Sequence, residues 1–391
     1  MDYDRLLDFC TTPKQQELIK AIDACHGSVP GAVRMLGLTG AVTNYHRTFR
    51  QVQERAAKAG HTDGPIARDI APGFTISKIS TLSKEGEGAK LEWVQQKPEA
   101  VAFQAQFLAF IEEACEPLKG LAPFVPPPES SDEALLAVYP IGDHHHGMRA
   151  DPDETGDAYD VKISRHRLIS SVDYLASKAP NAKNALLLNL GDYYHINDSS
   201  ETTPASNNKM DTDNRFGQVF DTGAMNLIAC VLRLLEKHET VHVWNMRGNH
   251  DPDAAQALSV AMAFYFHDQP RVIVDRGTSL FKFMRFGTNL IASHHGHGTK
   301  PDALPLLMAV DRKEDWAATD YRVWHVGHFH HRSIKEHPGC DIEIHRTLAG
   351  TDGWHHGKGY RSRREMQLIV YHEQTGEAWR TRFDPKMLEA A

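Results

Sequence analysis

The chain has 391 residues, of which 41% are hydrophobic and 24% are charged, as is usual for a folded globular protein. Its formal net charge of −8 argues against binding to nucleic acid through bulk charge, so such binding would need a local basic patch. Five scattered cysteines without a CxxC pair favour reduced thiols over a disulfide framework or a zinc finger.

The sequence predicts neither a secreted nor a membrane protein. The first residues, MDYDRLLDFC, are acidic and lack an apolar core, so we expect no signal peptide and a cytoplasmic location. No stretch approaches the ~18 apolar residues of a membrane span, so we expect no membrane partner. The unusual residue is histidine, with 24 copies that cluster at 144–146, 294–297, 325–331 and 355–356.

The N-terminal part of the chain predicts a small helical module. Apolar spacing indicates three helices, at residues 13–26, 30–36 and 41–59. The third helix is also basic, and Arg47, Arg50 and Lys58 lie off its apolar face. Two helices, a tight turn and a longer basic helix resemble a helix-turn-helix module, so we expect these three side chains to contact DNA phosphates. The alternative is a generic three-helix bundle with a solvated charged face.

Two further segments precede the main domain. Residues 74–94 alternate as two strands around a glycine-containing turn at 84–88, which predicts a hairpin that is either a wing on the helices or a small sheet without a ligand. A helix at 98–119 and a Pro-rich stretch at 121–132 follow. We therefore expect a helix-turn-helix or winged-helix-like module over 1–96, a helical and Pro-rich linker over 97–132, and a second domain over 133–391.

From residue 134 the pattern changes to strands alternating with helices, as in a layered α/β domain. Polar blocks follow five of the strand-like runs, at 143–145 (DHH), 191–192 (GD), 248–251 (GNHD), 294–297 (HHGH) and 327–330 (GHFH). Because ligands bind beyond the carboxyl ends of strands in such sheets, we expect these blocks to form one site.

The residue types in these blocks predict a metal site. Carboxylate, imidazole and amide ligands together suit Mn²⁺, Fe or Zn²⁺, whereas a magnesium site would be nearly all oxygen. One carboxylate shared between two ligand sets is how a pair of ions is held ~3.5–4 Å apart. Each histidine alone is better explained as a structural residue, so the prediction depends on the ordered set.

The ordered blocks resemble the signature of the calcineurin-like metallophosphoesterases, which reads DxH, GDxx, GNH[DE], a lone His and GHxH. The resemblance implies a four-layer α/β/β/α sandwich and two divalent metal ions, with Mn²⁺ preferred and Fe, Zn²⁺ or Ni²⁺ as alternatives. It implies a first metal bound by Asp143, His145, Asp192 and His330, and a second bound by Asp192, Asn249, His295 and His328.

The same resemblance implies that His250 binds no metal but protonates the leaving oxygen, with Asp251 holding its ring. His294 competes with His295 as the lone ligand, and His295 is preferred because the family often has the ligand just before a glycine. The residues after Gly-Asp in GDYYH (191–195) depart from the commoner small or acidic ones, so family contacts with the substrate do not transfer there.

Two segments are candidates for contacts with the substrate. Residues 197–217 are long enough for a lid, and an exposed loop is the alternative. Residues 353–364, GWHHGKGYRSRR, interleave basic and aromatic side chains, which suits contact with a phosphate backbone or stacking on a base, and we expect Lys358 and Arg361 to take part. A solvated run of charge is the alternative here.

The combination of the two parts resembles phage- or prophage-encoded phosphoesterases and the DNA repair nucleases of the superfamily. That likeness favours a phosphodiesterase or nuclease acting on DNA by in-line attack of a hydroxide that bridges two metals. The alternatives are a phosphomonoesterase or nucleotidase on small phosphoesters, and a DNA-binding protein with a vestigial metal site. The sequence leaves the natural substrate open and is compatible with a homo-oligomer.

Overall fold

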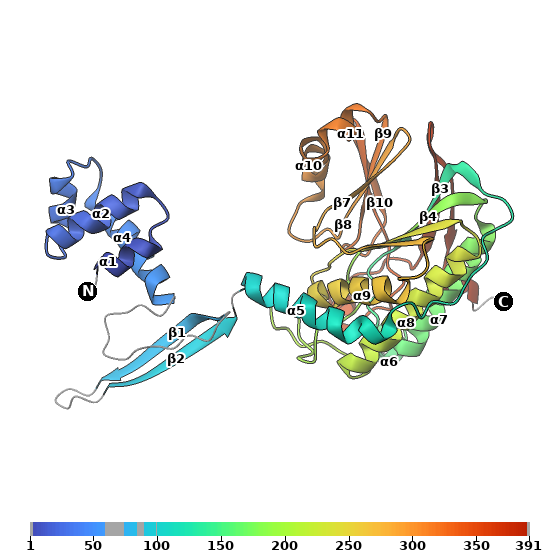
Figure 1. Ribbon diagram of the computed structural model, residues 1–391. Helices are drawn as coiled ribbons and strands as arrows, with labels where there is room; N and C mark the ends of the chain where they lie inside the picture. Colours follow the sequence, from blue (N-terminus) through green and yellow to red (C-terminus); the bar gives the residue numbers. More distant parts are fainter. Residues whose placement is uncertain (1–2, 59–73, 84–89, 99, 389–391) are drawn as a thin grey trace. The chain divides into compact units, whose positions relative to one another are not determined.

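The computed structural model describes residues 3–58, 74–83, 90–98 and 100–388, with side chains outside 57–107. It has two compact units, Met1–Phe110 and Ile111–Ala391 (Figure 1). The division falls within helix α5 (Ala100–Cys115), inside the segment that the sequence predicts as a linker.

The first unit begins with a small helical core. Its helices are α1 (Tyr3–Leu6), α2 (Pro13–Ala24), α3 (Val29–Met35) and α4 (Val42–Lys58). The side chain of Thr12 caps α2 by accepting a hydrogen bond from the backbone N–H of Gln15. Ile19 and Ile22 pack against Val52 of α4, so the apolar spacing of both helices meets in one core.

A hairpin follows these helices. Strands β1 (Phe74–Ser83) and β2 (Lys90–Pro98) pair antiparallel, with a bulge between Ile76 and Lys78. The predicted turn at 84–88 lies outside the described residues. The role of the hairpin, as a wing on the helices or as a small sheet without a ligand, stays a prediction.

The second unit contains two sheets. The six-stranded sheet has the order β13-β12-β3-β4-β5-β6. Its strands are β3 (Asp132–Ile141), β4 (Ala182–Asn189), β5 (Thr240–Asn245), β6 (Val272–Asp275), β12 (Met366–His372) and β13 (Gly376–Phe383). Strands β3 to β6 run parallel, whereas β12 is antiparallel to both β3 and β13.

The second sheet has five strands in the order β10-β11-β9-β8-β7. They are β7 (Lys282–Phe286), β8 (Asn289–His294), β9 (Tyr321–Val326), β10 (Ser333–His337) and β11 (Cys340–Ile344). Strands β8, β9 and β11 are parallel, so β8 and β9 end on the same edge.

Helices cover the outer face of each sheet. Those on the six-stranded sheet are α7 (Val161–Lys178), α8 (Phe216–Leu235) and α9 (Pro252–Tyr265), and α10 (Leu304–Asp311) packs on the five-stranded sheet. The remaining helices of the second unit are short: α6 (Pro152–Thr155), α11 (Lys313–Ala317) and α12 (Gly353–Gly357).

Side-chain alternation along the strands explains the layers. In β3, Ala137 and Tyr139 pack under the helices, while Leu136 and Val138 point the other way and share a core with Ile291 of the second sheet. The result is the mixed α/β architecture with α/β/β/α layers that the sequence predicts (Figure 1).

Among the described helices, α8 is long and apolar enough to cross a membrane by length and composition alone. Half of its apolar window is buried inside the protein. Leu227, Val231 and Leu234 lie in the core beneath the six-stranded sheet, so packing accounts for the apolar composition.

Candidate metal centre

Loops after the parallel strands of both sheets bring the predicted ligands together. Strands β3, β4, β5, β8 and β9 lead into the five polar blocks. Asp143, His145, Asp192, His328 and His330 all have positive φ angles, between 37° and 69°. Eight described non-glycine residues have a positive φ, and these are five of them. Residues other than glycine rarely adopt this backbone conformation. Such backbone conformations persist where packing enforces them and are concentrated at functional sites.

The first cluster consists of Asp143, His145 and His330. The Nε2 atoms of the two histidines are 3.3 Å apart, and Nε2 of His330 is 3.4 Å from Oδ1 of Asp143. One ligand atom from each residue lies within 4.8 Å of the others, and Asp143 is fully buried. Two imidazoles and a carboxylate converging in this way fit a divalent cation.

The second cluster consists of Asp192, His295 and His328, with Asn249 beside them. Nε2 of His295 is 3.2 Å from Oδ2 of Asp192 and 3.2 Å from Oδ1 of Asn249. Nδ1 of His295 is 2.8 Å from the carbonyl oxygen of Leu190. Because Nδ1–H donates to that carbonyl, Nε2 is the nitrogen left to bind a metal.

His294 does not reach either cluster. Its Nδ1 accepts a hydrogen bond from the backbone N–H of Gly296, and its ring stacks on Phe281 with centroids 4.7 Å apart. Strand alternation turns these two neighbouring rings in different directions. The geometry therefore favours His295 as the lone ligand.

Ionisation of the predicted ligands in the two clusters suits metal binding, with one exception. Burial alone would raise the pKa of Asp192, but His295 and His250 hold that pKa well below its usual value. Burial lowers the pKa of His145 strongly and that of His328 to about 4, so both rings are neutral at pH 7. Burial would lower the pKa of His295, yet Asp192 raises it to about 10. A cation bound there must displace that proton, which makes binding pH-dependent.

The prediction that Asp251 holds the ring of His250 is wrong. The Asp251 carboxylate is fully buried and accepts hydrogen bonds from the backbone N–H groups of Asp192, Tyr194 and Gly248, at 3.0–3.1 Å. These donors occupy the carboxylate, which instead ties the loop after β4 to the loop after β5. Burial, followed by the nearby Asp192, raises the pKa of Asp251 to about 7.

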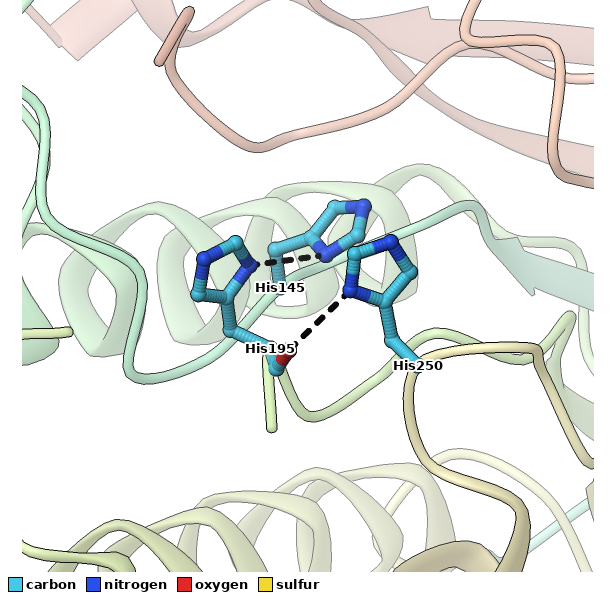
Figure 2. A group of neighbouring side chains, drawn as sticks. All are labelled: His145, His195 and His250. Atoms are coloured by element: carbon cyan, nitrogen blue, oxygen red, sulfur yellow. Dashed lines mark hydrogen bonds between the residues drawn. The ribbon is translucent and has the colours of Figure 1, made fainter. Parts of the chain in front are cut away.

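His195 takes the role expected of Asp251. Nδ1 of His250 donates to the backbone carbonyl of His195 at 3.1 Å, as Figure 2 shows. The ring of His195 contacts the first cluster as well, because its Nδ1 is 3.3 Å from Nδ1 of His145 (Figure 2). One residue therefore orients both a predicted ligand and the predicted proton donor. Its only signal in the sequence is its place in the unusual GDYYH block.

A further histidine, outside the predicted ligand set, lies beside the first cluster. The ring of His355 stacks on that of His330, with centroids 4.7 Å apart and an angle of 19°. Nδ1 of His355 donates to Oδ1 of Asp352 at 2.7 Å. Its signal in the sequence is the histidine pair at 355–356, inside the segment 353–364 whose basic and aromatic residues predict contact with a substrate.

The predicted substrate contacts lie in three places. Lys358 and Arg361 are exposed, just beyond α12 in the same unit as the metal clusters. Arg47 and Arg50 are exposed on α4 of the first unit, and Lys58 is the last residue of α4, with its side chain outside the described residues. Their contacts with a substrate stay predictions.

The candidate lid is anchored to the rest of the second unit. The side chain of Asn197 exchanges hydrogen bonds with Asp253, and Oδ2 of Asp213 accepts one from the backbone N–H of Val161. A bridge between Thr202 and Lys209 closes the segment on itself. Movement of this segment over a substrate stays a prediction.

No family model matches the chain, and no curated protein matches it either. Solved structures that resemble it include a conserved uncharacterized protein (predicted phosphoesterase) from Streptococcus pneumoniae, at 12% identity over 65% of this chain and 99% of that one, with a TM-score of 0.26. Vps29 from Entamoeba histolytica in complex with zinc has 16% identity over 64% and 99%, with a TM-score of 0.27. An archaeal phosphodiesterase has 11% identity over 64% and 99%, with a TM-score of 0.33.

Proposed function

We propose that this protein is a metal-dependent phosphoester hydrolase that holds two divalent cations in the adjacent clusters. The observation that carries the proposal is the convergence of loops from two sheets on Asp143, His145 and His330 on one side and Asp192, His295 and His328 on the other. Asp192 is the natural bridge, since its carboxylate lies against His295 while its pKa also responds to His145. The mixed nitrogen and oxygen donors favour Mn²⁺, with Fe, Zn²⁺ or Ni²⁺ as alternatives.

Two cations bound there would supply a nucleophilic water at neutral pH and neutralise charge on the phosphoryl oxygens. The chain's own part is to orient the reacting groups. His250 is held through Nδ1 by the carbonyl of His195, which leaves its Nε2 to deliver a proton to the leaving oxygen. Asp251 keeps the loops that carry Asp192 and His250 in register.

We infer that the substrate is a phosphodiester in DNA. Exposed Arg47 and Arg50 on α4 support this, because a chain with a net charge of −8 needs a local basic surface to approach a polyanion. A phosphomonoesterase or nucleotidase acting on small phosphoesters is the alternative. For that enzyme the first unit would not contact the substrate.

The metal-dependent reaction is tested with Asp192→Asn against an exposed aspartate control, Asp268→Asn. Hydrolysis of bis(4-nitrophenyl) phosphate is measured across Mn²⁺, Zn²⁺, Ni²⁺ and Fe²⁺, and bound metal is measured by mass spectrometry. Loss of turnover and of metal in Asp192→Asn alone is expected, because its carboxylate is the shared ligand. Near-wild-type turnover of Asp192→Asn with Mn²⁺ would disprove the two-metal assignment.

The DNA substrate is tested with the double change Arg47→Gln and Arg50→Gln. Cleavage of long DNA should weaken, and the slope of log DNA affinity against log salt concentration should become shallower by about two, one for each lost phosphate contact. Hydrolysis of the small diester should not change. The matched control is Lys14→Gln with Lys20→Gln, two exposed cations on α2. A protein inert on DNA but active on nucleoside monophosphates would establish the nucleotidase alternative.

A further inference from the structure

Two aromatic side chains are exposed in the segment beyond the metal clusters. Trp354 is 60% exposed and Tyr360 is 43% exposed, and their rings are nearly parallel, with centroids 6.1 Å apart and an angle of 27°. Trp354 is the most exposed tryptophan in the described part of the chain. Aromatic faces left in water are a favourable surface for another flat ring.

This aromatic pair is connected to the first metal cluster through His355. The ring of His355 meets Trp354 edge-on at 4.9 Å and Tyr360 edge-on at 5.3 Å. It also stacks in parallel on the ring of His330, a predicted metal ligand, with centroids 4.7 Å apart. The ring of His355 is therefore all that separates the aromatic pair from a residue of the site where phosphoester cleavage is proposed.

The segment that carries the pair is anchored at both ends. Asp352 accepts hydrogen bonds from the backbone N–H and from Nδ1 of His355, each at 2.7 Å. At the other end, the side chain of Arg364 lies 3.7 Å from Asp157 and bonds to Thr351. The aromatic rings are thus presented by a fixed backbone, which lowers the entropy cost of binding.

The charge around the pair suits an anionic ligand. Residues 353–364 contain four lysines and arginines and no acidic residue, in a chain whose net charge is −8. Lys358, Arg361 and Arg363 are exposed. Aromatic faces next to cations bind nucleotides well, since the rings stack on the base and the cations meet the phosphate.

We propose that Trp354 and Tyr360 form a platform on which a nucleobase of the substrate stacks while the phosphoester reaches the metal clusters. The substrate class would then be a nucleotide or nucleic acid, and a phosphoester without a base would bind less tightly. This inference rests on the proposed hydrolase function and specifies its substrate.

The kinetic test compares two esters with the same leaving group in the full-length protein loaded with Mn²⁺. They are the 4-nitrophenyl ester of thymidine 5′-monophosphate and methyl 4-nitrophenyl phosphate, which has no base. Trp354→Ala should raise KM for the thymidine ester by about 10-fold, in line with the loss of one base stack, and leave the methyl ester unchanged. Trp354→Phe should restore most of the loss, because it keeps an aromatic face.

The matched control is Trp379→Ala, which removes another partly exposed tryptophan, 40% exposed on β13. It should leave both KM values as in the wild type. Equal changes in KM for the two esters in Trp354→Ala would overturn the platform. The proposed hydrolase function would still stand in that case, provided that the wild-type protein hydrolyses the esters.

A binding measurement separates the two proposals. Tryptophan fluorescence is titrated with thymidine 5′-monophosphate and with ribose 5-phosphate in the presence of Zn²⁺. Quenching by the nucleotide but not by ribose 5-phosphate, retained in Trp379→Ala and lost in Trp354→Ala, supports the platform. This support holds even if the protein hydrolyses no ester, a result that would refute the proposed hydrolase function. Equal quenching by both ligands overturns the platform. A dimer that becomes monomeric in Trp354→Ala, measured by light scattering, also overturns it in favour of contact between two copies of the chain.

Discussion

Gly248→Ala is the sharpest test of how the two central loops pack. An alanine Cβ at this position would lie 1.9 Å from Oδ1 and 2.3 Å from the backbone nitrogen of Asp192. Real Cβ contacts are essentially never below 3.0 Å, so the loops would have to separate by about 1 Å, a displacement that can lower a rate by about 10²-fold. Overpacking of this kind also costs about 1–3 kcal/mol of stability.

The assay measures kcat on bis(4-nitrophenyl) phosphate, bound metal and the Tm of Gly248→Ala. We expect kcat about 10²-fold lower, weaker metal binding, and a Tm lower by about 2–4 °C for each kcal/mol lost. The control is Gly217→Ala in α8, where no atom of the described residues, apart from the adjoining backbone of the helix, lies within 4 Å of the added Cβ. It should keep its activity and gain up to about 1 kcal/mol of stability. Wild-type turnover and metal content in Gly248→Ala would refute the packing of the two loops described here.

Three further predictions concern histidines. His195→Ala should weaken metal binding by about 10- to 100-fold in calorimetric titration, because His145 loses its ring partner, whereas the exposed His166→Ala should not. His250→Gln should keep its metals but lower kcat by about 10²–10⁴-fold on alkyl esters and less on nitrophenyl esters; equal losses would remove its role as the acid. Burial lowers the pKa of His238 to about 4, so below about pH 6.5 the unfolded chain binds a proton that the folded protein does not. Stability should therefore fall between pH 6.5 and pH 4, and His238→Gln should show a shallower fall in Tm; an unchanged slope would show that His238 does not contribute.

Local patterns predicted most of the framework of the second unit. The continuous apolar run of β3 predicts a strand buried on both faces, and the structure packs Tyr139 under the helices and Val138 against the other sheet. The polar blocks could be recognised because each lies directly after a strand. Parallel strands then carry distant blocks to one edge, and this explains why Asp143 and His330 meet although 187 positions separate them.

Contacts that depend on the direction of a side chain could not be predicted in this way. Asp251 follows His250 directly, yet its carboxylate points to the backbone of the neighbouring loop. The partner that holds the ring of His250 is the carbonyl of His195, which belongs to a different loop. Adjacency in sequence therefore predicted the wrong partner, because backbone N–H groups competed for the carboxylate.

The sequence by itself predicted a set of candidate metal ligands, through the resemblance of its ordered polar blocks to a family signature, and the strands that lead into them. Ligand type and strand periodicity are local properties, so both can be recognised in single segments. Only the tertiary structure decided that His195 contacts His145, that His355 stacks on His330, and that His295 rather than His294 faces Asp192. Each of these contacts joins loops that are far apart in the chain. Their geometry is set by the packing of the two sheets and by the positive φ angles at the strand ends, neither of which a single segment specifies.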